Sequence, residues 1–175
     1  MTSSPLRRVC LALGSNLGDR EAHLRAALEG LRAGGVAIEA VSALYETRPW
    51  GVVEQPAFLN IALVGVTSLS ARELLMLAKR IEAAAGRDFS APRWTARPVD
   101  VDLALIEGET VAEPDLVVPH VLLAERSFVL VPLAEVAGAW VHPHLGVSIA
   151  ALRDARPPEE RAEARRVRGP EWVAG

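Results

Sequence analysis

Hydrophobic residues repeat with two different periods along the first 106 residues, and the order of these periods limits the folds open to the chain. Apolar runs at 8–13, 36–46, 58–67 and 98–106 are typical of strands. Apolar residues at helical spacing follow the run at 8–13 and the run at 58–67. The resulting order, β-α-β-β-α-β, predicts an α+β domain of the ferredoxin-like kind, an antiparallel sheet with helices packed on it.

Residues that favour helix starts stand where the helices are expected to begin. Asp19 can cap the first helix, and Ser70 with Glu73 forms a capping-box pattern before the second. Ser148 can cap a short last helix. Between these points we expect 128–136 to begin extended and to become helical after its proline.

The composition changes near residue 154. From there to 175 the chain is mainly Arg, Glu, Pro and Ala, with little apolar content. We therefore expect a single domain over 1–153 and a charged C-terminal tail, helical or frayed, over 154–175.

Composition and charge exclude several classes of protein. The chain has 175 residues, half of them hydrophobic, and a formal net charge of −3, so no overall positive field attracts nucleic acid or a membrane surface. A single cysteine, Cys10, excludes a disulfide framework and fits a small buried hydrophobe. No apolar segment approaches the roughly 20 residues of a membrane span. We expect a cytoplasmic protein, acting as a monomer.

The segment RPVDVDLALI at 97–106 places two carboxylates together on a predicted strand. Alternate residues of a strand share a face, so Asp100 and Asp102 lie on one side, about 7 Å apart. The opposite face would hold Val99, Val101, Leu103 and Leu105. Paired carboxylates can hold Mg²⁺ together with substrate phosphates. The alternative is a half-buried strand with a solvated polar face, and the two aspartates alone do not decide between them.

Three arginines, Arg87, Arg93 and Arg97, precede the aspartates in the loop RDFSAPRWTAR at 87–97. A metal–phosphate site needs cations on the phosphate oxygens that the metal does not reach, and the guanidinium fork suits that role. The loop composition also fits a segment that closes over a substrate. The alternative is a solvated basic loop, but its place directly before the aspartates favours phosphate binding.

Two further signals are weak when taken alone. GSN at 14–16 ends the first strand, where Gly14 permits close backbone approach and Asn16 offers amide hydrogen bonds; a tight β-to-α turn explains them equally well. His120 can contact a phosphate or satisfy a backbone group, and the second role is the commoner for a lone histidine.

Several blocks of sequence, in the same order along the chain, resemble the 6-hydroxymethyl-7,8-dihydropterin pyrophosphokinase family. They are LALGSNLGDR at 11–20, YETRPWG through QPAFLN at 45–60, RIEAAAGR at 80–87, RWTARPVDVDL at 93–103, VPH at 118–120 and ERSFVLVPL at 125–133. The resemblance implies an enzyme that transfers diphosphate from ATP to the hydroxymethyl group of the pterin and releases AMP, in folate biosynthesis. ATP would be the co-substrate and Mg²⁺, as two ions, the cofactor.

The resemblance also implies roles for individual residues. Asp100 and Asp102 would hold the two magnesium ions and, with Arg87 and Arg97, form the catalytic set. The residues lining the nucleotide site would be Glu82, Arg87, Arg93, Trp94, Arg97 and His120. The residues of the pterin pocket would be Thr47, Trp50, Phe58, Asn60, Arg126 and Phe128. Without the resemblance, both phenylalanines would read as core residues.

Four positions depart from the family pattern. Phe89 stands where a second arginine is frequent, Val121 where a tyrosine often follows the histidine, Thr95 where glycine is common, and Ala104 where a larger aliphatic is usual. These departures bear on nucleotide contacts and on the loop, not on the aspartate pair.

Two other functions remain open from the sequence. A nucleotidyltransferase also combines Gly-Ser with Asp-x-Asp, but as neighbouring elements, whereas Ser15 and Asp100 are far apart here. A non-catalytic ferredoxin-like module, for instance one that binds RNA, usually shows a basic sheet face with exposed aromatics. Here the candidate face carries Asp100 and Asp102.

Overall fold

The computed structural model describes residues 4–48, 54–87, 90 and 96–174. Its main sheet has the strand order β5-β1-β4-β3-β8, and β2 pairs with the other part of β4. The strands are β1 (Arg7–Ser15), β2 (Val36–Val41), β3 (Leu44–Thr47), β4 (Phe58–Thr67), β5 (Asp100–Ile106) and β8 (Arg165–Arg168). Every pairing within this sheet is antiparallel. With β2 and β3 counted as one interrupted strand, the first five strands give the ferredoxin-like arrangement, which confirms the predicted fold class.

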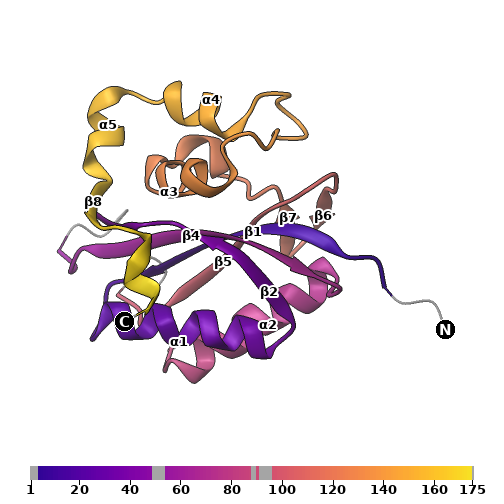
Figure 1. The fold of residues 1–175 in the computed structure, drawn as a ribbon, viewed down its shortest axis with the longest axis horizontal. Helices are drawn as coiled ribbons and strands as arrows, with labels where there is room; N and C mark the ends of the chain where they lie inside the picture. Colours follow the sequence, from indigo (N-terminus) through magenta and orange to yellow (C-terminus); the bar gives the residue numbers. More distant parts are fainter. Residues whose placement is uncertain (1–3, 49–53, 88–89, 91–95, 175) are drawn as a thin grey trace.

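Helices cover both faces of the main sheet (Figure 1). α1 (Arg20–Ala33) and α2 (Ala71–Ala84) lie on one face, and α3 (Ser127–Ala137) and α4 (Ile149–Asp154) lie on the other. Asp19 caps α1, Ser70 and Glu73 form the expected capping box on α2, and Ser148 caps α4. A small hairpin of β6 (Val111–Glu113) and β7 (Leu116–Val118) lies beside the main sheet. Within the described ranges, every helix is too short or too polar to cross a membrane.

Alternation along the central strands gives the two faces of the sheet separate hydrophobic cores. On β1, Val9, Leu11 and Leu13 pack toward α1 and α2, while Cys10 packs with the residues of α3 and α4. Cys10 is fully buried, as expected for a small hydrophobe, and burial raises the pKa of its thiol well above the usual range.

The predicted alternation of β5 holds only as far as Leu103. The pairing with β1 shifts between Cys10 and Leu11, which leaves Ala104 as an extra residue. Leu105 consequently packs in the α3–α4 core and not, as expected, beside Leu103. The bulge lies beyond the two aspartates, so Asp100 and Asp102 keep their common face.

The predicted strand over 36–46 is interrupted at Ser42 and Ala43, and this expectation is wrong. The Ala43 N–H donates to a carboxylate oxygen of Glu135 on α3 at 2.5 Å, and the Ser42 carbonyl accepts from the indole of Trp172 at 2.9 Å. Because side chains satisfy these backbone groups, the strand can bend there without leaving a buried polar group unpaired.

The expected structure of 128–136 is also wrong, because α3 is helical from Ser127 onward. Its apolar residues Leu130, Leu133 and Ala137 are buried at helical spacing against the sheet. This burial outweighs the single backbone hydrogen bond that Pro132 removes from the second turn.

The C-terminal segment was expected to be helical or frayed, and its described part, 154–174, is partly helical and also contains a strand. After α4 the chain forms α5 (Pro158–Glu163), adds β8 to the edge of β3, and ends in a short 3-10 helix, Pro170–Ala174. Trp172 is fully buried within the core formed by α1, α2 and the sheet. Arg25 of α1 donates to the Trp172 carbonyl at 2.8 Å and lies over its ring. One buried indole therefore anchors an otherwise polar segment.

Candidate active site

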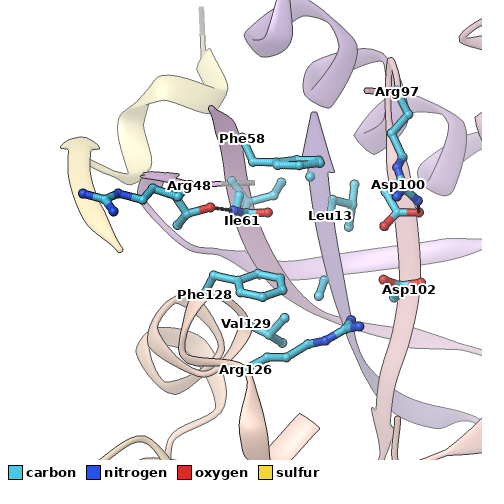
Figure 2. Close-up of a pocket in the computed structure, with 14 residues that line it drawn as sticks. Leu13, Arg48, Phe58, Ile61, Arg97, Asp100, Asp102, Arg126, Phe128 and Val129 are labelled. Carbon is cyan, nitrogen blue, oxygen red and sulfur yellow. Dashed lines mark hydrogen bonds and ion pairs between the residues drawn. The ribbon is translucent and has the colours of Figure 1, made fainter. Parts of the chain in front are cut away.

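A pocket opens between the α3–α4 face of the sheet and the N-terminal end of α3 (Figure 2). We call it the central pocket. It is lined by Ala12, Leu13, Gly14, Thr47, Arg48, Phe58, Asn60, Ile61, Arg97, Asp100, Asp102, Arg126, Phe128 and Val129. Four neighbouring strands, β1, β3, β4 and β5, thus contribute to one cavity, and strand pairing brings together residues far apart in the sequence.

Two phenylalanines and an amide form one end of the central pocket. Figure 2 shows the rings of Phe58, from β4, and Phe128, from α3, pointing into the same space from opposite sides. Asn60 is buried, and its amide nitrogen donates to the hydroxyl of Thr47 on the neighbouring strand. Neither phenylalanine is fully buried, so both rings have a surface available to a ligand. A flat heterocycle with a polar edge fits between such rings and beside such an amide.

Gly14 allows Asn60 and Phe58 to occupy these positions. A β-carbon at residue 14 would lie 2.6 Å from the Asn60 side-chain oxygen and 3.3 Å from a ring carbon of Phe58. The close approach expected at this glycine is therefore made by pocket side chains across the β1–β4 pair.

Charged groups form the other end of the central pocket. Asp100 and Asp102 point from β5 toward the cavity (Figure 2). One Asp100 oxygen, Oδ1, accepts from Arg87 at 3.1 Å and from Arg97 at 3.3 Å. Arg87 also donates to Glu82 at 2.7 Å, which links α2 to the end of β5. The expected arginine–aspartate cluster is present for the two arginines that the structure describes.

Crowding of the carboxyls shifts their pKa values. Burial, with the nearby Asp100 charge as the next cause, raises the pKa of Glu82 to about 7. Burial, followed by the charges of Asp100 and Glu82, raises the pKa of Asp102 well above its ordinary value. Arg126, whose side chain extends toward Asp102 in Figure 2, and Arg97 act in the opposite direction. The negative charge of these buried carboxylates is therefore poorly stabilised, and a bound divalent cation would stabilise it.

The donor set fits magnesium bound together with a substrate. Among the described residues, no group of three or more His, Cys, Asp or Glu side chains is arranged to hold a metal ion. Asp100 and Asp102 supply two carboxylates on one strand face, and Mg²⁺ typically takes one or two carboxylates and completes its shell with water and phosphate oxygens. The residues present thus fit a metal that arrives with a phosphorylated substrate better than a metal in an all-protein cage.

Asn16 is a residue whose role the sequence did not reveal. It is fully buried, and its amide oxygen accepts from the Arg97 backbone N–H at 2.8 Å. Its amide nitrogen donates to the Gln55 side chain at 3.0 Å and to the Pro56 carbonyl at 3.1 Å. Asn16 thereby joins the ends of the two loops that precede β4 and β5 and fixes the backbone at Arg97. The only signal in the sequence was its place in the GSN turn.

His120 lies behind the central pocket, in a small cavity that it lines with Asp102 and Arg126. Its Nδ1 accepts from the Leu122 N–H at 3.2 Å, so it satisfies a backbone group as the commoner interpretation holds. Burial lowers the pKa of the imidazole, which favours the neutral form with the proton on Nε2.

The structure brings most of the expected site residues together. Thr47, Phe58, Asn60, Arg97, Asp100, Asp102, Arg126 and Phe128 all line the central pocket. Arg87 and Glu82 lie next to this pocket. Arg87 donates to Asp100, and Glu82 accepts from the Val101 N–H at 3.1 Å. Trp50, Arg93 and Trp94 lie outside the described residues, as do the departures at Phe89 and Thr95.

A ferredoxin-like α+β domain with an aromatic end and a carboxylate–arginine end in one pocket defines a class of protein, one whose pocket suits a flat heterocycle at one end and a phosphorylated group at the other. Comparison with known proteins makes this specific. Residues 10–138 match the family model for 7,8-dihydro-6-hydroxymethylpterin-pyrophosphokinase (HPPK). The chain belongs to this family.

Named relatives agree with the family match. A 2-amino-4-hydroxy-6-hydroxymethyldihydropteridine pyrophosphokinase of Methylorubrum extorquens is 46% identical over 133 residues, covering 75% of this chain and 84% of the relative. The protein of that name from Bacillus subtilis is 45% identical over 127 residues, covering 72% of this chain and 75% of the relative. A mitochondrial folate synthesis bifunctional protein of Arabidopsis thaliana is 43% identical over 76% of this chain, which spans only 24% of that longer protein.

Solved structures show the same fold. The Plasmodium falciparum HPPK-DHPS structure with pterin and p-hydroxybenzoate superposes with a TM-score of 0.71, at 16% identity. The match covers 86% of this chain and 43% of that one. At this identity the likeness supports the fold alone, and it agrees with the strand order described above.

Proposed function

We propose that this chain is a pyrophosphokinase that transfers diphosphate from ATP to the hydroxymethyl group of 6-hydroxymethyl-7,8-dihydropterin, a step of folate biosynthesis. The observation that carries the proposal is the two-ended central pocket. Phe58 and Phe128 offer facing aromatic surfaces at one end, and Asp100 and Asp102 lie with Arg97 at the other. Family membership supplies the reaction, and the pocket supplies places for both reactants.

In the proposed reaction the hydroxymethyl oxygen attacks the β-phosphorus of ATP. An oxygen–phosphorus bond forms, the bond from the β-phosphorus to the bridging oxygen of the α-phosphate breaks, and AMP leaves with that oxygen. The hydroxyl proton passes to solvent, since no described side chain is placed as a persuasive base. No protein nucleophile is required, so the protein accelerates the reaction by alignment and charge stabilisation.

Each end of the pocket has a distinct task in this reaction. Phe58 and Phe128 hold the pterin ring, and Asn60 bonds its amide-like edge. Arg87 and Arg97 donate to Asp100 in the free protein. When the nucleotide binds, they would donate to phosphate oxygens instead. Asp100 and Asp102 would hold magnesium, as two ions, and the bound metal would neutralise charge on the phosphates.

We further propose that Glu82 and His120, which lie close to the acidic end, contact the nucleotide. We also propose that the protein acts as a cytoplasmic monomer, without nucleic-acid or membrane partners.

Calorimetric titration tests the proposed pairing of ligands. A non-hydrolysable ATP analogue should bind much more tightly with Mg²⁺ than without it, because a bound metal reduces the repulsion between the phosphates and the two aspartates. The hydroxymethyl-dihydropterin should then bind to the protein–analogue complex with a stoichiometry of one. Binding of the analogue that ignores Mg²⁺, or no binding of the pterin, would contradict the proposal.

A further inference from the structure

α5 lines a second cavity that shares a wall with the central pocket, although the helix lies beyond residue 138, where the family match ends. In Figure 1 this helix stands beside α3, on the path from α4 to β8. A cavity of about 320 Å³ between the two helices is lined on one side by Arg126, Ser127 and Phe128 and on the other by Arg156, Glu160 and Glu163. Because Arg126 and Phe128 also line the central pocket, the placement of α5 bears on both cavities.

A hydrogen bond joins the facing ends of α3 and α5. The buried hydroxyl of Ser127 donates to Oε2 of Glu160 at 3.3 Å. Ser127 is the first residue of α3 and stands between Arg126 and Phe128 in the chain. Any displacement of Ser127 therefore moves Phe128, at the pterin end of the central pocket, and Arg126, whose side chain extends toward Asp102.

Glu160 is itself held in one orientation. Arg156 donates to both of its carboxylate oxygens, from NH2 at 3.0 Å and 2.7 Å and from Nε at 3.1 Å. A bidentate pair of this kind fixes direction as well as distance. Arg161 donates to the Arg156 carbonyl at 3.2 Å, which ties α5 to the residues that precede it.

The N-terminus of α3 lacks the usual local support. Its N-cap position is Arg126, whose side chain makes no capping hydrogen bond. The first turn of a helix has four backbone N–H groups without partners inside the helix, so an uncapped first turn frays readily. The contact from Glu160 supplies a tie to this turn from outside α3.

We propose that Glu160 is a positioning residue for the pterin end of the central pocket, acting through Ser127 to hold Phe128 and Arg126 in place. The inference rests on the proposed function. The C-terminal segment would thereby contribute to substrate affinity. With Phe128 already held in place, pterin binding would not have to order this side chain.

The test is a double-mutant cycle on pterin affinity, measured by calorimetry with Mg²⁺ and the ATP analogue at saturation. Glu160→Ala and Ser127→Ala should each weaken pterin binding on the order of tenfold, as expected for a lost hydrogen bond to a charged group. The double variant should bind no more weakly than either single variant, because both remove the same contact. Glu160→Gln keeps an acceptor for Ser127 and should retain more affinity than Glu160→Ala.

Two readouts separate positioning from plain stabilisation. Affinity for the ATP analogue should fall much less than pterin affinity in every variant, because Phe128 lies at the pterin end and, of the two side chains held in place, only Arg126 extends toward Asp102. Glu159→Ala is the matched control, because Glu159 is an exposed carboxylate of the same helix for which the structure shows no hydrogen bond to α3. It should leave pterin affinity unchanged.

Two results would overturn the inference. One is unchanged pterin affinity in Glu160→Ala with only a lower melting temperature, which would make the contact purely structural. The other is additive losses in the double variant. If the original protein binds no hydroxymethyl-dihydropterin at all, the proposed function fails first, and this result is distinguishable because it appears before any substitution is made.

Discussion

Asp100 and Asp102 lie two residues apart on one strand face, yet their surroundings differ. Asp100 is neutralised by Arg87 and Arg97, whereas burial and the neighbouring carboxylates raise the pKa of Asp102. Asp100 is therefore already paired with cations, whereas Asp102 has too few cations nearby to stabilise its negative charge. This arrangement fits a metal that binds together with phosphates and takes over part of the role of the arginines.

Removal of either aspartate should abolish turnover and leave the fold intact. We expect Asp100→Ala or Asp102→Ala to lower the rate about a hundred-fold to ten-thousand-fold, because a bound metal contributes several kcal/mol of charge stabilisation. Asp115→Ala is a suitable control, since Asp115 is exposed and paired with Arg72 away from the pocket. Near-normal turnover in either folded variant would remove the basis for the metal site.

The two pocket phenylalanines should affect the two substrates differently. Phe58→Ala and Phe128→Ala should weaken pterin binding far more than binding of an ATP analogue, because the rings face the end of the pocket away from the aspartates. Calorimetry with each ligand measures the difference. If both variants lose mainly thermal stability and bind pterin normally, the residues belong to the core and not to the site.

Arg97 should act mainly on the chemical step. Its guanidinium lies 3.3 Å from Asp100, and its backbone is fixed by Asn16. If its contact with the transferring group forms fully only in the transition state, Arg97→Ala lowers the single-turnover rate more than it lowers affinity for an ATP analogue. Arg32→Ala on the surface of α1 serves as a control. Equal losses in both quantities would make Arg97 a ground-state clamp.

At the scale of elements, the sequence predicted what depends on local periodicity. The strands predicted at 8–13, 58–67 and 98–106, the two helices between strands and the caps at Asp19, Ser70 and Ser148 all follow from short patterns. The break at Ser42 and Ala43 does not, because its backbone groups are satisfied by Glu135 and Trp172, 92 and 130 residues away. Contacts between residues so far apart in the sequence cannot be recognised from a short stretch of it.

The same distinction holds for the site. The aspartate pair could be predicted because both residues lie on one strand, and the family resemblance added Phe58, Asn60 and Phe128. Asn16 could not be recognised, since its partners at Gln55 and Arg97 are 39 and 81 residues away. The role of Gly14 likewise depends on the register between β1 and β4, which places Asn60 opposite it.

The C-terminal segment offers a prediction about stability. Trp172→Ala should lower the free energy of unfolding by about 3–5 kcal/mol, because it leaves a cavity in the core and removes the donor to the Ser42 carbonyl. Urea unfolding measures this loss. Val167→Ala on β8, where the valine is 40% exposed, should change the free energy by less than about 1 kcal/mol. An unchanged stability in Trp172→Ala would mean that the segment frays in solution.

On the scale of the whole molecule, the layered arrangement separates the competing functions. A ferredoxin-like module that binds RNA through its sheet presents that face to the nucleic acid. Here α3 and α4 cover the face that carries the aspartates, and α1 and α2 cover the other (Figure 1). Among the residues that the structure describes, a pocket opens at one end of the sheet, and such a pocket suits small molecules better than a strand of RNA.

The central claim is that ATP is cleaved between its α- and β-phosphates and that the diphosphate goes to the pterin. Phosphorus NMR of a reaction with ATP, Mg²⁺ and hydroxymethyl-dihydropterin tests it directly. The account predicts AMP and a pterin diphosphate ester in equal amounts, both lost in Asp102→Ala. Release of inorganic diphosphate with a nucleotidylated product would instead identify a nucleotidyltransferase and contradict the account.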